Sequence, residues 1–439
     1  MKFPASKIIH GGVIFLFFQF FFISNSFPEK LPPGEIISRL LSGDEEQVNN
    51  TYIYISRTKP NDLIQNLSDF LLSGEQASKK SIIIKALKYY PFAKTVPACL
   101  DILKKSPSFL VKKEIIDYLS ASNDKRIVLP IVEELASPFF AVRESAILAL
   151  KAIGDDRMYP VMLRMMENEN PIYRVYALET LFYIYDMRFY DLLMKMLGDE
   201  NKSIRYYVLK CVENNRLKDA LANVRKAALN DVSWENRVAA IHILGVLNDD
   251  NALYVLLKCL TEENREIRFT AAESLYLLKL RNSAYSLSEQ LAIESDNGIK
   301  KVIIDTLIEL NNAGGYKGLR KVLSDDKNVS MRINSAFALG SIRLRDSIYI
   351  LLNGLNDPDP KVRAEVCNSL GYYSTKETVQ ALLDAINSDP DRYVRTAALY
   401  SIKRIGLKHV VLPLFDRYVI EDDPIMKEKL RLTVRSFLK

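Results

Sequence analysis

Arg363 and Cys367 are the residues that first suggest chemistry, because they lie among aspartates and prolines in the stretch NDPDPKVRAEVCNSLG, residues 356–371. An arginine can hold a carboxylate or phosphate, and a cysteine can act as a nucleophile or a metal ligand. Both roles need partner residues at a defined spacing. The cysteines and histidines are instead scattered: Cys99, Cys211, Cys259, Cys367, His10, His242 and His409. We therefore predict no metal site, no cofactor and no catalytic residue.

The arginine of this stretch recurs along the chain at a nearly constant spacing. Eight copies are clear: Arg143, Arg174, Arg205, Arg237, Arg268, Arg332, Arg363 and Arg395. Lys300 fills the gap in the series, and weaker copies begin at Asn49, Lys80, Lys112 and Lys427. These thirteen repeat starts follow one another at steps of 31 or 32 residues. A catalytic arginine is needed only once, so we interpret the eight arginines as a structural ladder that bonds carboxylates and carbonyls of the adjoining turn.

The residues around each repeat start predict two helices. Small or apolar residues follow the start at offsets of three, four, six and seven, as in VRESAILAL, which places them on one face of a helix. A second apolar set follows at offsets of sixteen, nineteen and twenty-three, after polar breaks such as Gly154-Asp155-Asp156. One such hairpin is too small to bury its own core and is stable only when stacked on neighbours. The predicted fold is an all-α solenoid, a superhelix of stacked helical hairpins.

Helix-entry signals and charges at the two ends define the expected organisation. Prolines and aspartates such as Asp359 and Pro360 stand just before the first helix, where a fixed φ and an N-terminal cap suit helix entry. We expect a signal segment at residues 1–26, a linker with an N-terminal capping helix at 27–43, about twelve repeats at 44–422 and a charged C-terminal capping helix at 423–439.

The repeat resembles a known family. The period near 31 and the pattern of NDPDPKVRAEVCNSLG and PFFAVRESAILALKAIG are similar to HEAT-like repeats, the short variety also found in phycobilisome lyases. The resemblance covers about residues 34–439 and implies paired helices, with the second helices lining the concave surface. It implies little about function, because the shared residues are those that stack helices.

Composition excludes some classes of function. The 439-residue chain is 48% hydrophobic and has only 16 glycines and 17 prolines, which favours a helical array over a turn-rich β protein. The net charge is +6, of which Lys2 and Lys7 supply two. A domain that grips nucleic acid usually has a clear basic excess, so we predict no nucleic-acid partner.

The N-terminal residues predict export. A basic start, an apolar run from Val13 to Ile23 and small residues at Ser24 and Ser26 form the three parts of a secretory signal peptide with a cut after Ser26. The run is short for a spanning helix, which needs roughly 20 apolar residues. We expect a periplasmic or secreted protein, with an uncleaved membrane anchor as the alternative. In an oxidising compartment, a disulfide between Cys211 and Cys259 of adjacent units is conceivable, although buried core thiols are the favoured interpretation.

Enzymes that resemble HEAT-like proteins provide a second class of hypothesis. The metal hydroxylases of this kind carry His-Glu pairs as iron ligands, and no histidine here is followed by glutamate. The DNA glycosylases use tryptophan in a basic groove, and Trp234 is the only tryptophan. A lyase-like activity stays open as an alternative to a non-catalytic role.

A surface stripe is the remaining candidate site. At offset twenty-one on the second helices the chain carries a basic set: Arg164, Lys195, Lys226, Lys258 and Lys321. Glu289 is an exception, and Asn353, Asp384 and Asp416 follow towards the C-terminus. Arg225, Lys317 and Arg320 add to the basic part. Tyr254, Tyr285 and Tyr349 share offset seventeen, one turn earlier. A concave basic groove of this kind would steer an acidic protein partner. The alternative is an ordinary solvated helix face. The leading hypothesis is an exported protein-binding scaffold of unknown oligomeric state, with a membrane-tethered structural protein as a further alternative.

Overall fold

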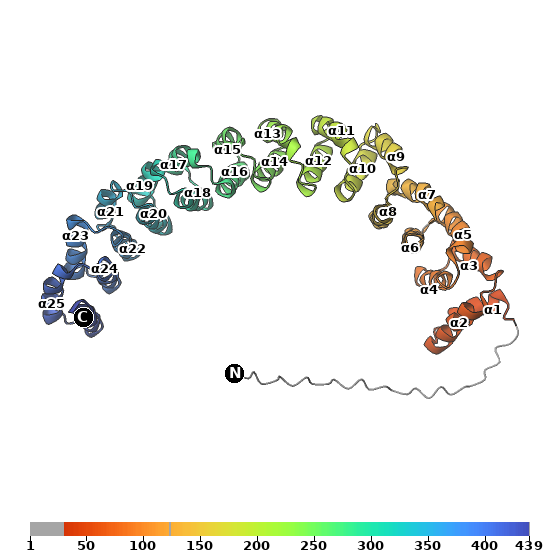
Figure 1. Ribbon diagram of the computed structural model, residues 1–439, viewed down its shortest axis with the longest axis horizontal. Helices are drawn as coiled ribbons and strands as arrows, with labels where there is room; N and C mark the ends of the chain where they lie inside the picture. Colours follow the sequence, from red (N-terminus) through yellow and green to blue (C-terminus); the bar gives the residue numbers. More distant parts are fainter. Residues whose placement is uncertain (1–29, 123, 439) are drawn as a thin grey trace, which may run out of the picture. The chain divides into compact units, whose positions relative to one another are not determined.

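The computed structural model describes residues 30–122 and 124–438. These residues form 26 α-helices and eight short 3-10 helices and contain no strand, and 77% of them are helical. The predicted all-α class is therefore confirmed (Figure 1). The predicted signal segment lies outside the described residues.

Helices of two kinds alternate along the chain. The even-numbered helices contain the thirteen repeat starts: α2 (Glu45–Thr58), α4 (Ala77–Leu87), α6 (Phe109–Leu119), α8 (Phe140–Ile153), α10 (Pro171–Tyr183), α12 (Lys202–Asn214), α14 (Trp234–Val246), α16 (Arg265–Leu278), α18 (Asn297–Leu310), α20 (Val329–Ile342), α22 (Pro360–Leu370), α24 (Arg392–Ile405) and α26 (Pro424–Leu438). The odd-numbered helices carry the second apolar set: α1 (Pro33–Leu40), α3 (Leu63–Leu72), α5 (Phe92–Lys105), α7 (Val128–Glu133), α9 (Met158–Met166), α11 (Tyr190–Lys195), α13 (Leu221–Asn230), α15 (Leu253–Cys259), α17 (Ala284–Ile293), α19 (Tyr316–Asp325), α21 (Ser347–Gly354), α23 (Lys376–Ser388) and α25 (Val411–Ile420). The 3-10 helices adjoin odd-numbered helices: η1 (Lys125–Ile127), η2 (Glu134–Ala136), η3 (Met187–Phe189), η4 (Met196–Gly198), η5 (Lys218–Ala220), η6 (Arg281–Ser283), η7 (Ala313–Gly315) and η8 (Lys408–Val410).

The helices divide into two compact units, which we describe separately. Unit 1 is Met1–Tyr159 and unit 2 is Pro160–Lys439. In unit 1, α3 packs on α5 and α6 packs on α8. In unit 2, each even-numbered helix from α14 to α22 packs both on an odd-numbered neighbour and on the next even-numbered helix, and α12 packs on η4 and α14. Each unit is thus a stack of helical hairpins, which is solenoid architecture.

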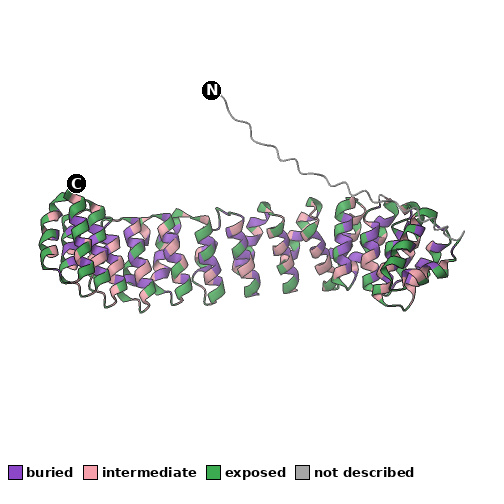
Figure 2. Ribbon diagram, turned by 90° about the horizontal axis from the view of Figure 1, so that it is seen from below, coloured by how far each residue is buried: buried purple, intermediate pink, exposed green. Residues whose placement is uncertain are grey.

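The apolar offsets predicted from the sequence form the core. In α12, Val208, Leu209 and Val212 follow Arg205 at offsets three, four and seven, and all three are fully buried. On α13, which packs on the following helix α14, Val224 and Ala228 are fully buried as well. Figure 2 shows buried residues running along the stacked helices, flanked by exposed ones. The core therefore lies between the two sets of helices and is continued from each hairpin to the next.

The helix entries follow the predicted capping chemistry. Pro360 is the first residue of α22, and the Asp359 carboxylate accepts a hydrogen bond from the backbone N–H of Lys361 at 2.8 Å. The Asp391 carboxylate caps α24 in the same way, by accepting from the N–H of Tyr393 at 2.7 Å. These caps satisfy N–H groups that the first helical turn leaves without partners.

The two kinds of helix form two rows in unit 2, and one implication of the resemblance is wrong there. The even-numbered helices lie on the inner side of the bend of unit 2, and the second helices, the odd-numbered set from α9 to α25, lie on the outer side (Figure 1). The even-numbered helices also pack more closely on one another at most steps. We call these the inner row and the outer row. The predicted concave basic stripe therefore lies on the outer row.

Small residues explain why the inner row is the tighter one. Ser369 of α22 faces Gly340 of α20, where an added Cβ would lie 2.6 Å from the serine side chain. The Ser369 hydroxyl donates to the Ala336 carbonyl of α20 at 2.9 Å. Ser274 of α16 and Gly245 of α14 meet in the same way. Because closer spacing places a row on the inside of a bend, these contacts set the direction of curvature.

One step of the outer row departs from this pattern. Gly318 of α19 lies directly against the backbone of Ser288 in α17, with no room for a Cβ. The N–H of Gly318 donates to the Ser288 hydroxyl at 2.7 Å. At this step α17 and α19 approach each other as closely as their inner-row neighbours α18 and α20 do.

Candidate functional site

Arg205 shows what the recurrent arginine does. Its Nε and Nη2 each donate to the Asp231 carboxylate at 2.7 Å, and its Nη1 donates to the carbonyl of Asp199 at 2.8 Å. Asp199 precedes α12, whereas Asp231 precedes the next inner helix, α14. One guanidinium therefore ties the loop before its own helix to the loop before the next helix.

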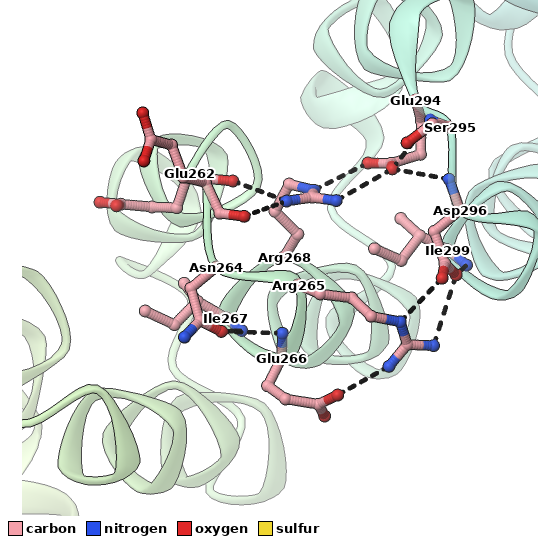
Figure 3. A network of polar contacts seen from close by, with 11 residues as sticks. Glu262, Asn264, Arg265, Glu266, Ile267, Arg268, Glu294, Ser295, Asp296 and Ile299 are labelled. Carbon is pink, nitrogen blue, oxygen red and sulfur yellow. Dashed lines mark hydrogen bonds and ion pairs between the residues drawn. The ribbon is translucent and has the colours of Figure 1, made fainter.

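Arg268 of α16 has the same arrangement (Figure 3). Its Nη1 donates to the carbonyls of Glu262 and Glu263, at 2.9 and 2.8 Å, and its Nε donates to the Glu294 carboxylate at 3.0 Å. Beside it, Arg265 bonds Asp296 at 2.7 Å. The loops between consecutive layers are thus joined by charge-assisted hydrogen bonds, the strong kind in proteins.

The other repeat starts of unit 2 make related pairs with acids 25 or 26 residues later. These are Arg174–Asp199, Arg237–Glu262, Lys300–Asp326, Arg332–Asp357, Arg363–Asp389 and, at a longer distance of 3.6 Å, an arginine with an acid 28 residues on, Arg395–Asp423. In unit 1, Arg143 donates to the Ser137 carbonyl at 2.9 Å, and Lys112 pairs with Glu134 at 2.6 Å. The arginines therefore serve in stacking, and their geometry offers no site for an external anion.

These bonds lower the pKa values of two ladder acids, Asp231 and Glu294. Burial of the Asp231 carboxylate opposes ionisation, but hydrogen bonds from Arg205 and the N–H of Ser233 outweigh it and lower the pKa of Asp231. Burial likewise opposes ionisation of Glu294, and bonds from Arg268 and a backbone N–H lower its pKa overall. The hydrogen bond to Asp231 raises the pKa of Arg205. Asp231 and Glu294 are therefore ionised at neutral pH.

The predicted basic stripe lies on the outer row of unit 2, and the five cations that share offset twenty-one are exposed. Arg164, Lys195, Lys226, Lys258 and Lys321 stand at the same offset on α9, α11, α13, α15 and α19. Within the described residues none of these five is in an ion pair, although the Lys258 ammonium lies 5.9 Å from the Tyr254 ring centre. Arg320 is exposed beside Lys321 and also lacks an ion pair among the described residues. These cations are free to meet an external acid.

Two members of the predicted stripe already have acidic partners. Arg225 donates to both carboxylate oxygens of Asp249 at 2.6 and 2.8 Å. Lys317 of α19 pairs with Glu289 of α17 at 2.9 Å. Arg225 therefore ties α13 to the turn before α15, and we regard both residues as poorer binding candidates than the exposed five.

The three predicted tyrosines lie on the same outer surface. Tyr254, Tyr285 and Tyr349 are 65%, 65% and 72% exposed. Tyr254 adjoins Lys258, as described above, and Tyr285 lies on α17, one turn before Glu289. Aromatic rings beside cations suit protein interfaces better than an inert surface. These residues are on the surface, not in the core.

The inner row carries aromatic residues that the sequence analysis missed. Phe337, Tyr372 and Tyr400 are 45%, 38% and 55% exposed on or at the end of α20, α22 and α24. Phe337 and Tyr400 both stand five residues after their repeat starts. A scan of the polar offsets for apolar residues would have found this row.

Two segments of unit 2 match a known repeat family. Residues 221–308 and 316–403, which run from α13 to α24, match the model of the HEAT repeats. These two segments are HEAT repeats. The resemblance to the HEAT-like family is thereby confirmed. A search among curated proteins finds no match.

Solved structures support the same fold. The structure of Kap121p bound to RanGTP aligns with a TM-score of 0.53 and 14% identity, over 85% of this chain and 48% of that chain. The chain thus spans about half the length of Kap121p. Importin β aligns with 11% identity and a TM-score of 0.45, over 92% of this chain and 61% of that chain. At 14% identity, the alignment with Kap121p supports a shared α-solenoid fold and nothing further. The importin β alignment adds no argument, because its TM-score is lower.

Hollows occur at equivalent places between successive helical repeats of unit 2. One of about 370 Å³ is lined by Lys226 and the Arg205–Asp231 pair, and another of about 420 Å³ is lined by Lys321 and the Lys300–Asp326 pair. Each combines one stripe lysine with one ladder pair. Each hollow therefore places an unpaired lysine next to a ladder pair whose two charges already neutralise each other.

The described residues offer no sign of another kind of site. In the part of the chain that the structure describes, no group of three or more histidine, cysteine, aspartate or glutamate side chains is arranged to hold a metal ion. The four cysteines are buried and free. No helix within residues 30–122 or 124–438 is both long and apolar enough to cross a membrane.

Proposed function

We propose that the protein is an exported, non-catalytic scaffold that binds an acidic protein along the outer row of unit 2. The observation that carries this proposal is the set of five exposed cations at one offset, free of ion pairs among the described residues, on α9, α11, α13, α15 and α19. Five layers each contribute one cation, with Glu289 on α17 as the one interruption between Lys258 and Lys321, so the binding free energy is spread over several helices. A positive field of this kind accelerates encounter with an acidic partner and makes binding sensitive to salt.

A charge-reversal experiment tests the binding surface. The triple variant Lys195→Glu, Lys226→Glu and Lys258→Glu is compared with the wild type in pull-downs from the native compartment. A matched control reverses three exposed lysines of unit 1 that have no ion pair among the described residues: Lys88, Lys104 and Lys151. We expect the stripe variant to lose a partner that the control retains. An unchanged set of partners in the stripe variant would contradict the proposal.

Export rests on the sequence of residues 1–26 and has a separate test. If the signal segment is cleaved after Ser26, the mature chain begins at Phe27. The intact mass of the protein isolated from its native compartment measures this directly. A chain that still begins at Met1 would contradict cleavage and would favour the membrane-tethered alternative.

A further inference from the structure

The inner row of unit 2 changes character between α18 and α20. Five residues after the repeat start, the chain has Lys210, His242, Glu273 and Asp305 on α12, α14, α16 and α18. At the same offset α20, α22, α24 and α26 carry Phe337, Asn368, Tyr400 and Leu432. The first group is charged or titratable, as expected of a solvated surface. The second group is mainly apolar.

These apolar side chains are exposed to an unusual degree. Phe337, Tyr400 and Leu432 are 45%, 55% and 50% exposed. Tyr393, two helical turns before Tyr400, is 75% exposed. Single exposed apolar residues need no explanation, but apolar residues at one offset on three of four successive inner helices mark an interaction surface. We call the exposed inner side of α20, α22, α24 and α26 the aromatic inner surface.

Cations border the aromatic inner surface at the carboxyl ends of its helices. The Arg343 and Arg404 guanidinium groups lie 4.9 and 4.2 Å from the ring centre of Tyr372, one at each helix next to α22. Arg404 is also held by the carbonyl of Gly371 at 3.2 Å. Arg343, Lys403 and Arg435 are exposed and have no ion pair among the described residues.

The acids of this surface do not neutralise those cations. Glu428 is paired with Arg431 at 2.7 Å. Burial raises the pKa of Glu365, so its carboxyl group is less readily charged. The aromatic inner surface therefore has an excess of positive charge, which favours an occupant that carries carboxylates.

The spacing of the layers selects the backbone of the occupant. Packed helices lie roughly 8–10 Å apart, so equivalent side chains on successive inner helices recur at about that distance. A polyproline II segment has three residues per turn and a rise of about 3.1 Å, so every third side chain points the same way at intervals of roughly 9 Å. An amphipathic helix presents its apolar residues about 5.4 Å apart per turn and does not match.

We propose that the aromatic inner surface binds an acidic segment of a protein in the polyproline II conformation, with an apolar residue at every third position. Apolar side chains pack on Phe337, Tyr400 and Leu432, and the polar Asn368 faces the segment between the first two. Carboxylates of intervening residues meet Arg343, Lys403 and Arg435. Aromatic grooves suit polyproline II segments, because the backbone is ordered before binding. This surface is separate from the outer-row stripe.

A defined peptide tests the proposal. The probe is a fluorescent peptide of four copies of Leu-Pro-Glu, compared with a scrambled peptide of the same composition and with one that has lysine in place of glutamate. Fluorescence anisotropy measures binding to the full chain. We expect the ordered peptide to bind at least about tenfold more tightly than either control peptide, a difference of about 1.4 kcal/mol.

Protein variants assign that binding to the surface. Phe337→Ala with Tyr400→Ala should weaken binding of the ordered peptide by at least about tenfold, as removal of central aromatic anchors does. His242→Ala with Glu273→Ala, at the same offset on α14 and α16, should leave it unchanged. All four side chains are at least partly exposed, and equal melting temperatures would show that the variants remain folded.

Three outcomes would overturn the proposal. They are equal binding of the ordered and scrambled peptides, binding that Phe337→Ala with Tyr400→Ala leaves intact, and self-association lost in that variant without any peptide binding, which would make a second copy the occupant. The stripe variant Lys195→Glu, Lys226→Glu and Lys258→Glu should still bind the ordered peptide. Failure of the outer-row proposal therefore leaves this one standing, and the reverse is also true.

Discussion

Asp389 joins two arginines of different layers. Its carboxylate accepts hydrogen bonds from Arg363 at 2.8 and 3.0 Å, and its backbone carbonyl accepts one from Arg395 at 3.0 Å. Asp357 has the same relation to Arg332 and Arg363. The ladder therefore passes through consecutive loops without interruption at these steps, and each acid is held on two sides.

Breaking one ladder pair should destabilise unit 2. The side chains of Arg363 and Asp389 are only 13% and 10% exposed, so removing one partner leaves a largely buried charge unpaired. We expect Arg363→Ala to lower the free energy of unfolding by about 2–4 kcal/mol, between the values for exposed and fully buried pairs. Urea denaturation followed by circular dichroism measures this, and the double variant with Asp389→Ala should cost less than the two single variants together.

An exposed pair serves as the control for the ladder. Arg39 and Glu35 are four residues apart on α1 and are both substantially exposed. Arg39→Ala should cost no more than about 0.5 kcal/mol, as for other exposed helix pairs. Equal losses for Arg39→Ala and Arg363→Ala would contradict a stabilising role for the ladder.

Acid should weaken the ladder. The pKa values of Asp231 and Glu294 are lower in the folded chain than in the unfolded one, so the unfolded state binds protons more readily. Stability from these groups is fully present above their unfolded pKa values of about 4, and it is lost as the pH falls through the lower folded values. Urea midpoints at pH 7 and pH 3 measure the effect. Glu294→Gln should reduce both the stability at pH 7 and the further loss at pH 3, and an identical pH dependence in that variant would refute this assignment.

Gly340 should not tolerate a methyl group. In an ordinary helix Gly→Ala gains about 1 kcal/mol, but a Cβ here would lie 2.8 Å from the Ser369 Cα. Overpacking of this kind costs about 1–3 kcal/mol, so we expect Gly340→Ala to lower the melting temperature. Gly198→Ala is the control, because nothing lies within 4 Å of an added Cβ there. A stabilised Gly340→Ala variant would show that the inner row is looser than we describe.

The cysteines should be inert in the folded chain. Burial raises the pKa of the Cys99, Cys211 and Cys367 thiols to about 12 and that of Cys259 to about 11. Thiolate is the reactive form, so a thiol reagent at pH 8 should label the folded protein very slowly and all four cysteines after unfolding. Only two reactive thiols after unfolding without reductant would indicate the Cys211–Cys259 disulfide instead.

The sequence was informative about each hairpin and much less so about how hairpins are arranged. Offsets from Arg205 identify Val208, Leu209 and Val212 as core, because helical periodicity is a local property. The direction of the bend depends instead on contacts between helices about thirty residues apart, such as Gly340 with Ser369. No offset within one repeat reveals it, so the stripe is predicted on the correct helices but on the wrong side of the bend.

The candidate sites were predictable to a similar extent. Exposure of Lys226 and Tyr254 follows from their offsets on an amphipathic helix. The pairing of Arg225 with Asp249 could not be foreseen, because it depends on how the turn before α15 folds back toward α13. Phe337 and Tyr400 were missed because they stand at an offset that is polar in most other repeats and is not part of the pattern that the repeats share.

The close approach of Gly318 to Ser288 has a consequence for what the outer row can touch. Because α17 and α19 are more closely packed than the other neighbours of the outer row, their exposed sides lie nearer to each other. Tyr285, Lys317 and Lys321 are carried by these two helices. One partner molecule therefore reaches side chains of both helices more readily at this step than at the other steps of the outer row.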